Sequence, residues 1–140
     1  VVLRNPHSIR PYQHVLEPLF VYLTIGAMQM EDKNYAGYYN VGPDDRDCVS
    51  TGELVELFCK SWGDGMSWVN QYDGGPHEAN FLKLDCSKLK SVFGWKPVWD
   101  VRTAIEKTVE WSKAWMNGEN MEHLMEKQIL EYGEQREKEY

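Results

Sequence analysis

The pattern of apolar and polar positions predicts short strands that alternate with helices. Residues 1–4 and 9–15 are rich in β-branched side chains and are bounded by prolines, as is typical of extended segments. Further apolar runs predict strands at residues 38–42, 67–72 and 81–84, the first of them buried and the last clearer than the second. Because the two kinds of element alternate, we expect a mixed α/β or α+β fold with short strands and about five helices.

Apolar residues at three- and four-residue spacing predict the helices. Residues 19–30 form one, with Pro18 in its first turn and Glu17 as its cap. This helix is apolar nearly all round, so we expect it to be covered on more than one side, in part by protein outside this chain. Ser50 and Glu53 have the spacing of a capping box, which starts a helix that runs to about Trp62.

The second half of the chain predicts two capped helices and a polar tail. Asp85 precedes a short helix that ends at Gly94, and Asp100 precedes a longer one that ends at residues 117–118. Residues 119–140 are rich in Glu and Lys, with a thin apolar stripe, and read as a polar helix or a frayed tail. We therefore divide the chain into a domain at 1–118 and a tail at 119–140.

Composition narrows the classes of partner. The 140 residues carry a net charge of -7, so the overall field repels nucleic acid and anionic membranes. No apolar run approaches the roughly 20 residues that span a bilayer. The three cysteines are odd in number and lack CxxC spacing, which argues against disulfides and a zinc site and favours the cytoplasm. Since the chain opens on a strand without an initiator Met, we expect a piece of a longer protein.

Self-sufficient catalytic signatures are absent from the sequence. It contains no GxGxxG turn, no GxxxxGK[ST] loop, no Tyr with a Lys four residues later and no GxSxG elbow. The four histidines include no i, i+4 pair, so a metal site would need tertiary contacts alone. The sequence therefore predicts that this chain alone holds neither a nucleotide cofactor nor catalytic residues.

Polar residues gather instead in three loops, at residues 4–19, 42–47 and 74–80. In the first, "RNPHSIRPYQHVLEPL", prolines stiffen the backbone around Arg10, whose guanidinium could grip a phosphate with two parallel bonds. A surface arginine paired with a carboxylate is the alternative. In the third, His77, Glu78 and Asn80 could hydrogen-bond a base or a sugar, although a solvated turn would have the same composition.

Four segments together resemble a known family. "RNPHSIRPYQHVLEPL", "YYNVGPDD", "PHEANFLKLDCSKLKSVFGWKPVWD" and "TAIEKTVEWSKAW" resemble, in order and spacing, the C-terminal part of the CDP-glucose 4,6-dehydratase family. This family lies within the extended short-chain dehydrogenase/reductase superfamily. The "YNVG" and "SK-x5-GW-x-P" motifs are similar to many nucleotide-sugar enzymes, whereas the first segment and "PHEA…LKLDCSK" resemble the CDP-glucose branch in particular.

The resemblance implies a C-terminal nucleotide-sugar-binding domain. In such enzymes a preceding dinucleotide-binding half holds NAD and the catalytic Tyr and Lys. There NAD takes a hydride from C4 of glucose, water leaves across C5 and C6, and the hydride returns to C6, as deoxysugar and O-antigen synthesis requires. The resemblance places Arg10 against the substrate pyrophosphate, with Pro11 and His14 where many relatives have Asp and Tyr. It places His77, Glu78 and Asn80 over the nucleotide.

Three readings stay open. The first is this binding domain of CDP-glucose 4,6-dehydratase, inactive alone, with CDP-glucose and the N-terminal half as partners and a homo-oligomer as the full-length state. The second is the matching domain of a UDP- or dTDP-sugar epimerase or dehydratase. The third is an interaction module that holds a protein partner with four tryptophans, Trp62, Trp68, Trp95 and Trp99.

Overall fold

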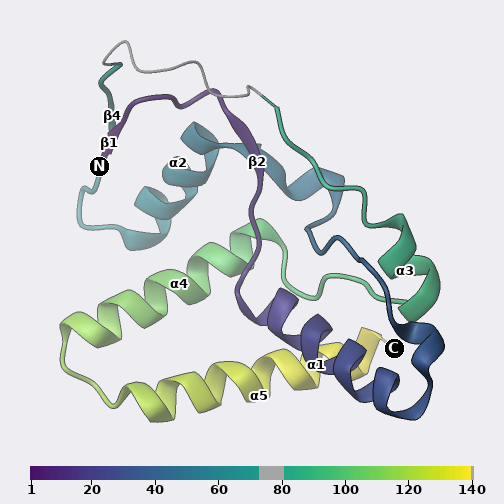
Figure 1. Cartoon of the computed structure of the whole chain (residues 1–140). Helices are drawn as coiled ribbons and strands as arrows, with labels where there is room; N and C mark the ends of the chain where they lie inside the picture. Colours follow the sequence, from purple (N-terminus) through teal and green to yellow (C-terminus); the bar gives the residue numbers. More distant parts are fainter. Residues whose placement is uncertain (73–80, 140) are drawn as a thin grey trace.

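A computed structural model describes residues 1–72 and 81–139 of the chain (Figure 1). The described residues contain five α-helices and a few short strands, so the predicted mixed α/β class is confirmed. The helices are α1 (Leu16–Glu31), α2 (Thr51–Trp62), α3 (Ser87–Phe93), α4 (Val101–Met116) and α5 (Met121–Glu139). The strands are β1 (Val2–Leu3), β2 (Ile9–Pro11), β3 (Cys48–Ser50) and β4 (Val69–Asn70), with 3-10 turns η1 (Lys33–Tyr35) and η2 (Asp45–Asp47).

The strands pair two by two. β1 runs parallel to β4, with Val2 opposite Val69, and β2 runs antiparallel to β3, with Arg10 opposite Val49. The predicted extended segments at 1–4, 9–15 and 67–72 therefore all contain a strand. The second is shorter than expected, because the chain turns after Pro11 and enters α1 at Leu16.

Two predicted strands are wrong. Residues 38–42 form no strand in the described structure: Tyr38 is 95% exposed, while Tyr39 and Val41 pack their side chains on the core. Residues 81–84 make only an isolated bridge, from Phe81 to Ile9. Both segments are apolar and extended, but a strand also needs a neighbour whose backbone groups pair with its own, and the described chain gives them almost none.

Helices α2 and α4 follow their predicted caps. The Ser50 hydroxyl accepts from the Glu53 N–H and the Glu53 carboxylate accepts from the Ser50 N–H, which completes the capping box of α2. The Asp100 carboxylate accepts from the Thr103 N–H at 2.8 Å and caps α4. At the end of α3, Gly94 has φ 63°, the left-handed conformation that favours glycine.

Two other predicted caps are wrong. Helix α1 begins at Leu16 with no side-chain cap, because Glu17 lies inside its first turn and is turned into the core. Asp85 does not cap α3, whose N-cap residue is Cys86, although the Asp85 carboxylate accepts from the Ser87 N–H at 2.9 Å.

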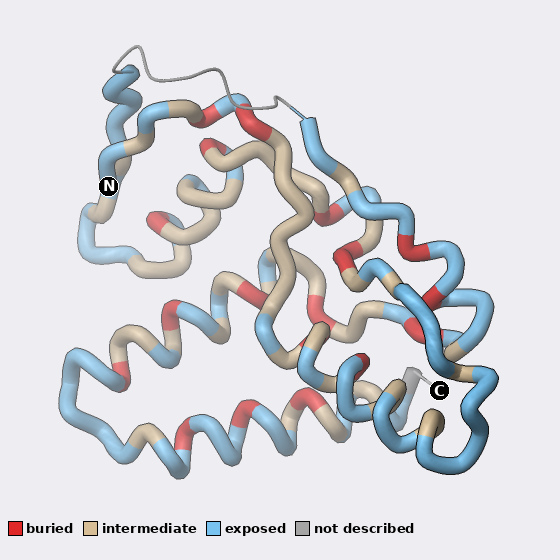
Figure 2. The backbone as a smooth tube through the Cα atoms, viewed as in Figure 1, coloured by how far each residue is buried: buried red, intermediate tan, exposed pale blue. Residues whose placement is uncertain are grey.

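Helix α5 packs along α4 as its antiparallel neighbour (Figure 1). Its buried residues are Leu124, Gln128 and Tyr132, at four-residue spacing, so the buried stripe runs further along the helix than the sequence indicated (Figure 2). Lys107 pairs with Glu131, and Lys127 with Glu110, across the two helices. Residues 121–139 are therefore a packed helix rather than a frayed end.

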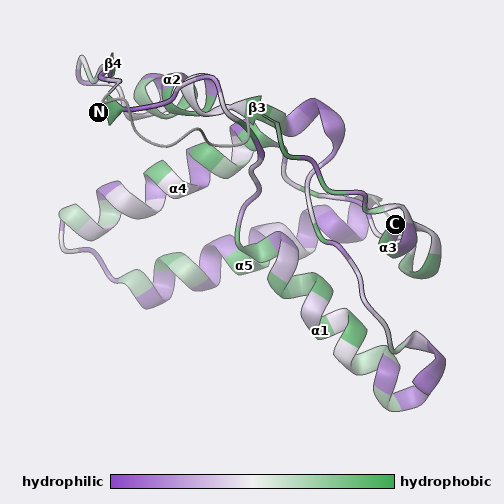
Figure 3. Ribbon diagram, turned by 45° about the horizontal axis from the view of Figure 1, so that its top comes forward, coloured by the Kyte–Doolittle hydropathy of each residue, from purple (hydrophilic) through white to green (hydrophobic). Residues whose placement is uncertain are grey.

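The inner side of α1 joins the main apolar cluster, and its outer side does not. Val21 packs with Cys86, Leu89 and Trp95, all at most 6% exposed. On the opposite side Tyr22 and Leu23 are 61% and 74% exposed. Figure 3 shows α1 beginning near α5 and its C-terminal end extending away from the other helices. The predicted excess of apolar surface on this helix is thus present as an exposed face.

Candidate functional site

Arg10 lies at the centre of β2, where backbone pairing with β3 fixes its course. It is half-buried, and its Nη1 donates to the carbonyl oxygen of Ile9 at 2.9 Å. Pro11 follows it, and the Tyr12 N–H donates back to the Arg10 carbonyl at 3.1 Å. The backbone that carries this guanidinium is therefore held before any ligand arrives.

A cavity of about 780 Å³ opens beside the same stretch, and we call it the opening cavity. Its lining combines a cation, polar groups and rings: Arg4, Asn5, Pro6, His7, Ile9, Asn70, Tyr72 and Phe81. A cation can neutralise a phosphate, and exposed rings can stack on a base. The chemistry of this lining suits a nucleotide, and its size lies within the range of small-molecule sites.

Hydrogen bonds fix the loop that lines the opening cavity. The Asn5 amide donates to the Ser8 hydroxyl at 2.7 Å and accepts from the His7 N–H, which fixes the turn between β1 and β2. The Gly52 N–H donates to the Pro6 carbonyl at 2.8 Å. A Cβ on Gly52 would lie 3.1 Å from that same oxygen, so any larger residue here would require the Pro6 backbone to move by a few tenths of an ångström.

The predicted residues His77, Glu78 and Asn80 lie outside the described residues. The described residues on either side of that segment, Tyr72 and Phe81, both line the opening cavity. The Leu82 N–H donates to the Ile9 carbonyl at 3.1 Å, next to Arg10. The role predicted for the three polar residues stays a prediction.

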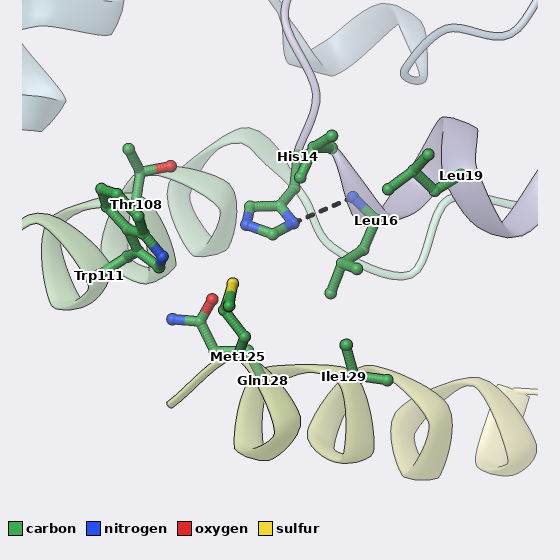
Figure 4. Close-up of a pocket in the computed structure, with 9 residues that line it drawn as sticks. His14, Leu16, Leu19, Thr108, Trp111, Met125, Gln128 and Ile129 are labelled. Carbon is green, nitrogen blue, oxygen red and sulfur yellow. Dashed lines mark hydrogen bonds between the residues drawn. The ribbon is translucent and has the colours of Figure 1, made fainter. Parts of the chain in front are cut away.

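His14 lines a different cavity, of about 370 Å³, between α1, α4 and α5 (Figure 4). Its neighbours there are mostly apolar: Val15, Leu16, Leu19, Trp111, Met125 and Ile129, with Thr108 and Gln128. Nδ1 accepts from the Leu16 N–H at 3.3 Å, and the ring meets Trp99 edge-on at 4.8 Å. Burial lowers the pKa of His14, and the charge of Lys107 lowers it further, so the imidazole is neutral at pH 7.

Arg10 follows Ile9 in β2 but does not itself line the opening cavity, and it does not line the cavity of His14 either. The structure thus does not bring Arg10 and His14 into one cavity. A neutral imidazole among apolar side chains is a weak phosphate ligand, and the geometry favours a packing role for His14. The contact with substrate that the resemblance implies for it stays a prediction.

The polar loop at 42–47 borders a third cavity, of about 740 Å³, whose charges are largely paired. Lys90 lies 2.5 Å from Asp44, and Lys83 lies 3.4 Å from Asp45. The buried Asp47 accepts from the Val101 N–H at 3.1 Å and so ties this loop to α4. These contacts make the loop a structural element rather than an anion site.

Sequence reasoning missed several of these residues. Arg4, Tyr72 and Phe81 have ordinary sequence contexts, and only the folded loops bring them together. Glu17 carried a signal that could have found it. It is an acidic residue in the first turn of an otherwise apolar helix, where a buried carboxylate needs several donors.

Comparison with known proteins finds that the chain is similar in sequence to one curated relative. It is 40% identical over 133 residues to CDP-glucose 4,6-dehydratase of Salmonella typhimurium. The alignment takes in 94% of this chain and 37% of the relative, at the relative's C-terminal end. This chain therefore spans little more than a third of the relative's length, and no protein-family model matches it. The predicted resemblance to the C-terminal part of this family is confirmed.

Proposed function

We propose that the chain is the nucleotide-sugar-binding part of a CDP-glucose 4,6-dehydratase. The observation that carries the proposal is the 40% identity to that enzyme along 94% of the chain. The substrate is CDP-glucose, and the product of the complete enzyme is CDP-4-keto-6-deoxyglucose. Such a role belongs in the cytoplasm, where nucleotide sugars are made and where the three unpaired cysteines would stay reduced.

Arg10 and the opening cavity beside it, whose lining includes Ile9 but not Arg10, are the proposed substrate site. The guanidinium of Arg10 contacts the pyrophosphate, and the charge of Arg4 at the cavity supports the same anion. Tyr72 and Phe81 offer exposed rings on which cytosine can stack. From the resemblance, His77, Glu78, Asn80 and His14 complete the set.

As the resemblance implies, we assign NAD and the catalytic groups to a preceding dinucleotide-binding half. A dinucleotide cradle needs an open parallel sheet with a glycine-rich turn into a helix. The described residues offer only two pairs of strands, and only β1 and β4 run parallel. The residues that the structure describes therefore do not fit NAD, and no chemical step is assigned to them.

The exposed face of α1 is the proposed contact with that preceding part. Leu19, Tyr22 and Leu23 expose about half or more of their surface on one helix. An apolar patch of this kind marks an interaction surface. The full-length protein is expected to be a homo-oligomer. In the described part of the chain, no helix is both long and apolar enough to cross a membrane.

The other two readings have less support. An interaction module built on four tryptophans would need them at the surface, yet Trp95 and Trp99 are 2% exposed. Trp62 stacks on Phe58, and the Trp68 indole donates to Glu56. A UDP- or dTDP-sugar enzyme would share the fold, and its substrate would differ from CDP-glucose chiefly in the nucleotide base.

Titration calorimetry of the 140-residue chain with CDP-glucose, UDP-glucose and dTDP-glucose tests the proposal. We expect CDP-glucose to bind most tightly. We also expect no 4-keto sugar when NAD is added, because the chain lacks the groups that the chemistry needs. Tighter binding of UDP- or dTDP-glucose would favour the second reading, and no binding of any nucleotide sugar would contradict the proposal.

A further inference from the structure

Helix α5 reaches the first turn of α1 through one buried carboxylate. Glu17 is 0% exposed. Its Oε1 accepts from the N–H groups of Val98 and Trp99 at 2.8 and 2.7 Å, and its Oε2 accepts from the Tyr132 hydroxyl at 2.8 Å. Tyr132 is itself 3% exposed. Two segments far from α1 in sequence thus supply three donors to one side chain.

Stability alone does not explain this carboxylate. Burial raises the pKa of Glu17, and its hydrogen bonds only partly oppose the rise. Well-packed apolar residues often stabilise a protein as much as a buried charge does. Hydrogen bonds are directional, however, so three of them fix the place of a side chain more narrowly than an apolar contact would.

The same cluster holds the residues just before α1. The Trp99 ring packs against His14, and its indole N–H donates to the Gln135 side chain of α5 at 2.6 Å. Tyr132 meets the Trp99 ring edge-on at 5.2 Å. Residues 10–17 therefore run between two fixed ends, the β2–β3 pairing at Arg10 and the Glu17 cluster.

We propose that Tyr132 and Glu17 are positioning residues, through which α5 anchors the far end of residues 10–16 and so steadies the segment that begins at Arg10 of the substrate site. The inference rests on the proposed function for the substrate. The ordering of residues 10–16 does not depend on it and can be measured without ligand. Residues 119–140, which we predicted from the sequence to be a polar helix or tail, would then contribute indirectly to substrate binding.

Hydrogen exchange of the 140-residue chain, with calorimetry against CDP-glucose, tests this inference. Tyr132→Phe removes one hydroxyl that donates to a carboxylate. We expect the backbone N–H groups of residues 10–16, of which Pro11 has none, to exchange at least about tenfold faster, as loss of one charge-assisted hydrogen bond allows, while those of α2 do not change. The affinity for CDP-glucose should fall with them.

Two variants serve as controls. Tyr22→Phe removes a hydroxyl from a tyrosine that is 61% exposed, and it should change neither measurement. Glu17→Gln keeps an acceptor for Val98 and Trp99 and can donate to Tyr132, so exchange at residues 10–16 should stay as in the wild-type chain. Should Tyr132→Phe not fold, Gln135→Ala removes the α5 acceptor of the Trp99 indole N–H and should speed exchange at the same residues.

The outcomes separate the two proposals. Exchange at 10–16 that stays unchanged, or that rises equally in α2, would overturn the positioning role whatever the binding shows. If the wild-type chain binds no CDP-glucose while exchange responds as expected, the positioning of the segment stands and the proposed function is wrong.

Discussion

Helix α1 differs from helices α2 and α4 in the kind of contact that fixes where it begins. Helices α2 and α4 begin at side-chain caps, Ser50 with Glu53 and Asp100, that act within one turn. Helix α1 begins without such a cap and is fixed by Glu17, whose partners lie more than 80 residues away. Short-range contacts therefore define one region, and long-range contacts define the other.

Helix α1 also exposes more apolar surface. One edge of α1 is buried through Val21, while Tyr22 and Leu23 point away from the described chain. The neighbouring residues 38–42 have strand composition and no strand partner. A region whose apolar surface and backbone both lack partners is one that a further body of protein would complete, whereas α2 exposes no large apolar side chain.

The largest expected effect tests the buried edge of α1. Leu89→Ala removes a side chain that is 1% exposed and packs on Val21, so it should cost about 3 kcal/mol of unfolding free energy in urea. Like Leu89, Val92 belongs to α3, but it is 39% exposed, so Val92→Ala is the matched control. Equal losses for the two would mean that this cluster does not hold α1.

A smaller effect tests the locally specified region. Ser50→Ala removes the acceptor for the Glu53 N–H and should cost about 1 kcal/mol by the same denaturation measurement. Ser50→Asp keeps an acceptor and should retain most of the stability. A loss as large in Ser50→Asp as in Ser50→Ala would show that the cap does not stabilise α2.

The smallest effect tests the exposed face. Leu23→Ser should change the stability of the 140-residue chain by less than about 0.5 kcal/mol, because the side chain is 74% exposed. In a full-length protein the same change should destabilise clearly, since the face would then be covered. Val21→Ser, at a 2% exposed position, should destabilise both. A Leu23→Ser effect that is small in both proteins would mean that nothing covers α1.

The fold could be predicted where short-range signals decide it. The capping box, the Asp100 cap and the left-handed Gly94 depend on groups within a few residues, and their helices begin or end where expected. The strand at 38–42 and the Glu17 cap were wrong, because strand pairing and carboxylate burial depend on distant partners. The division of the chain at residue 118 stays a prediction.

The candidate site was predictable only in part. The prolines around Arg10 indicated a stiffened strand, and the structure places Arg10 in β2. Arg4, Tyr72 and Phe81 meet at the opening cavity through loop contacts that no spacing in the sequence reveals. The Tyr132 contact to Glu17 spans 115 positions, so no local pattern could have predicted it.

Calorimetric titration of CDP-glucose into the full-length protein and its Arg10→Ala variant tests the central claim most directly. We predict that Arg10→Ala weakens binding by about 1.5–3 kcal/mol, as for a lost charge-assisted hydrogen bond, with little change in folding. Arg10→Lys should recover only part of the loss, because an ammonium cannot form the planar fork. Unchanged affinity in a correctly folded Arg10→Ala protein would contradict the claim that this arginine grips the substrate phosphate.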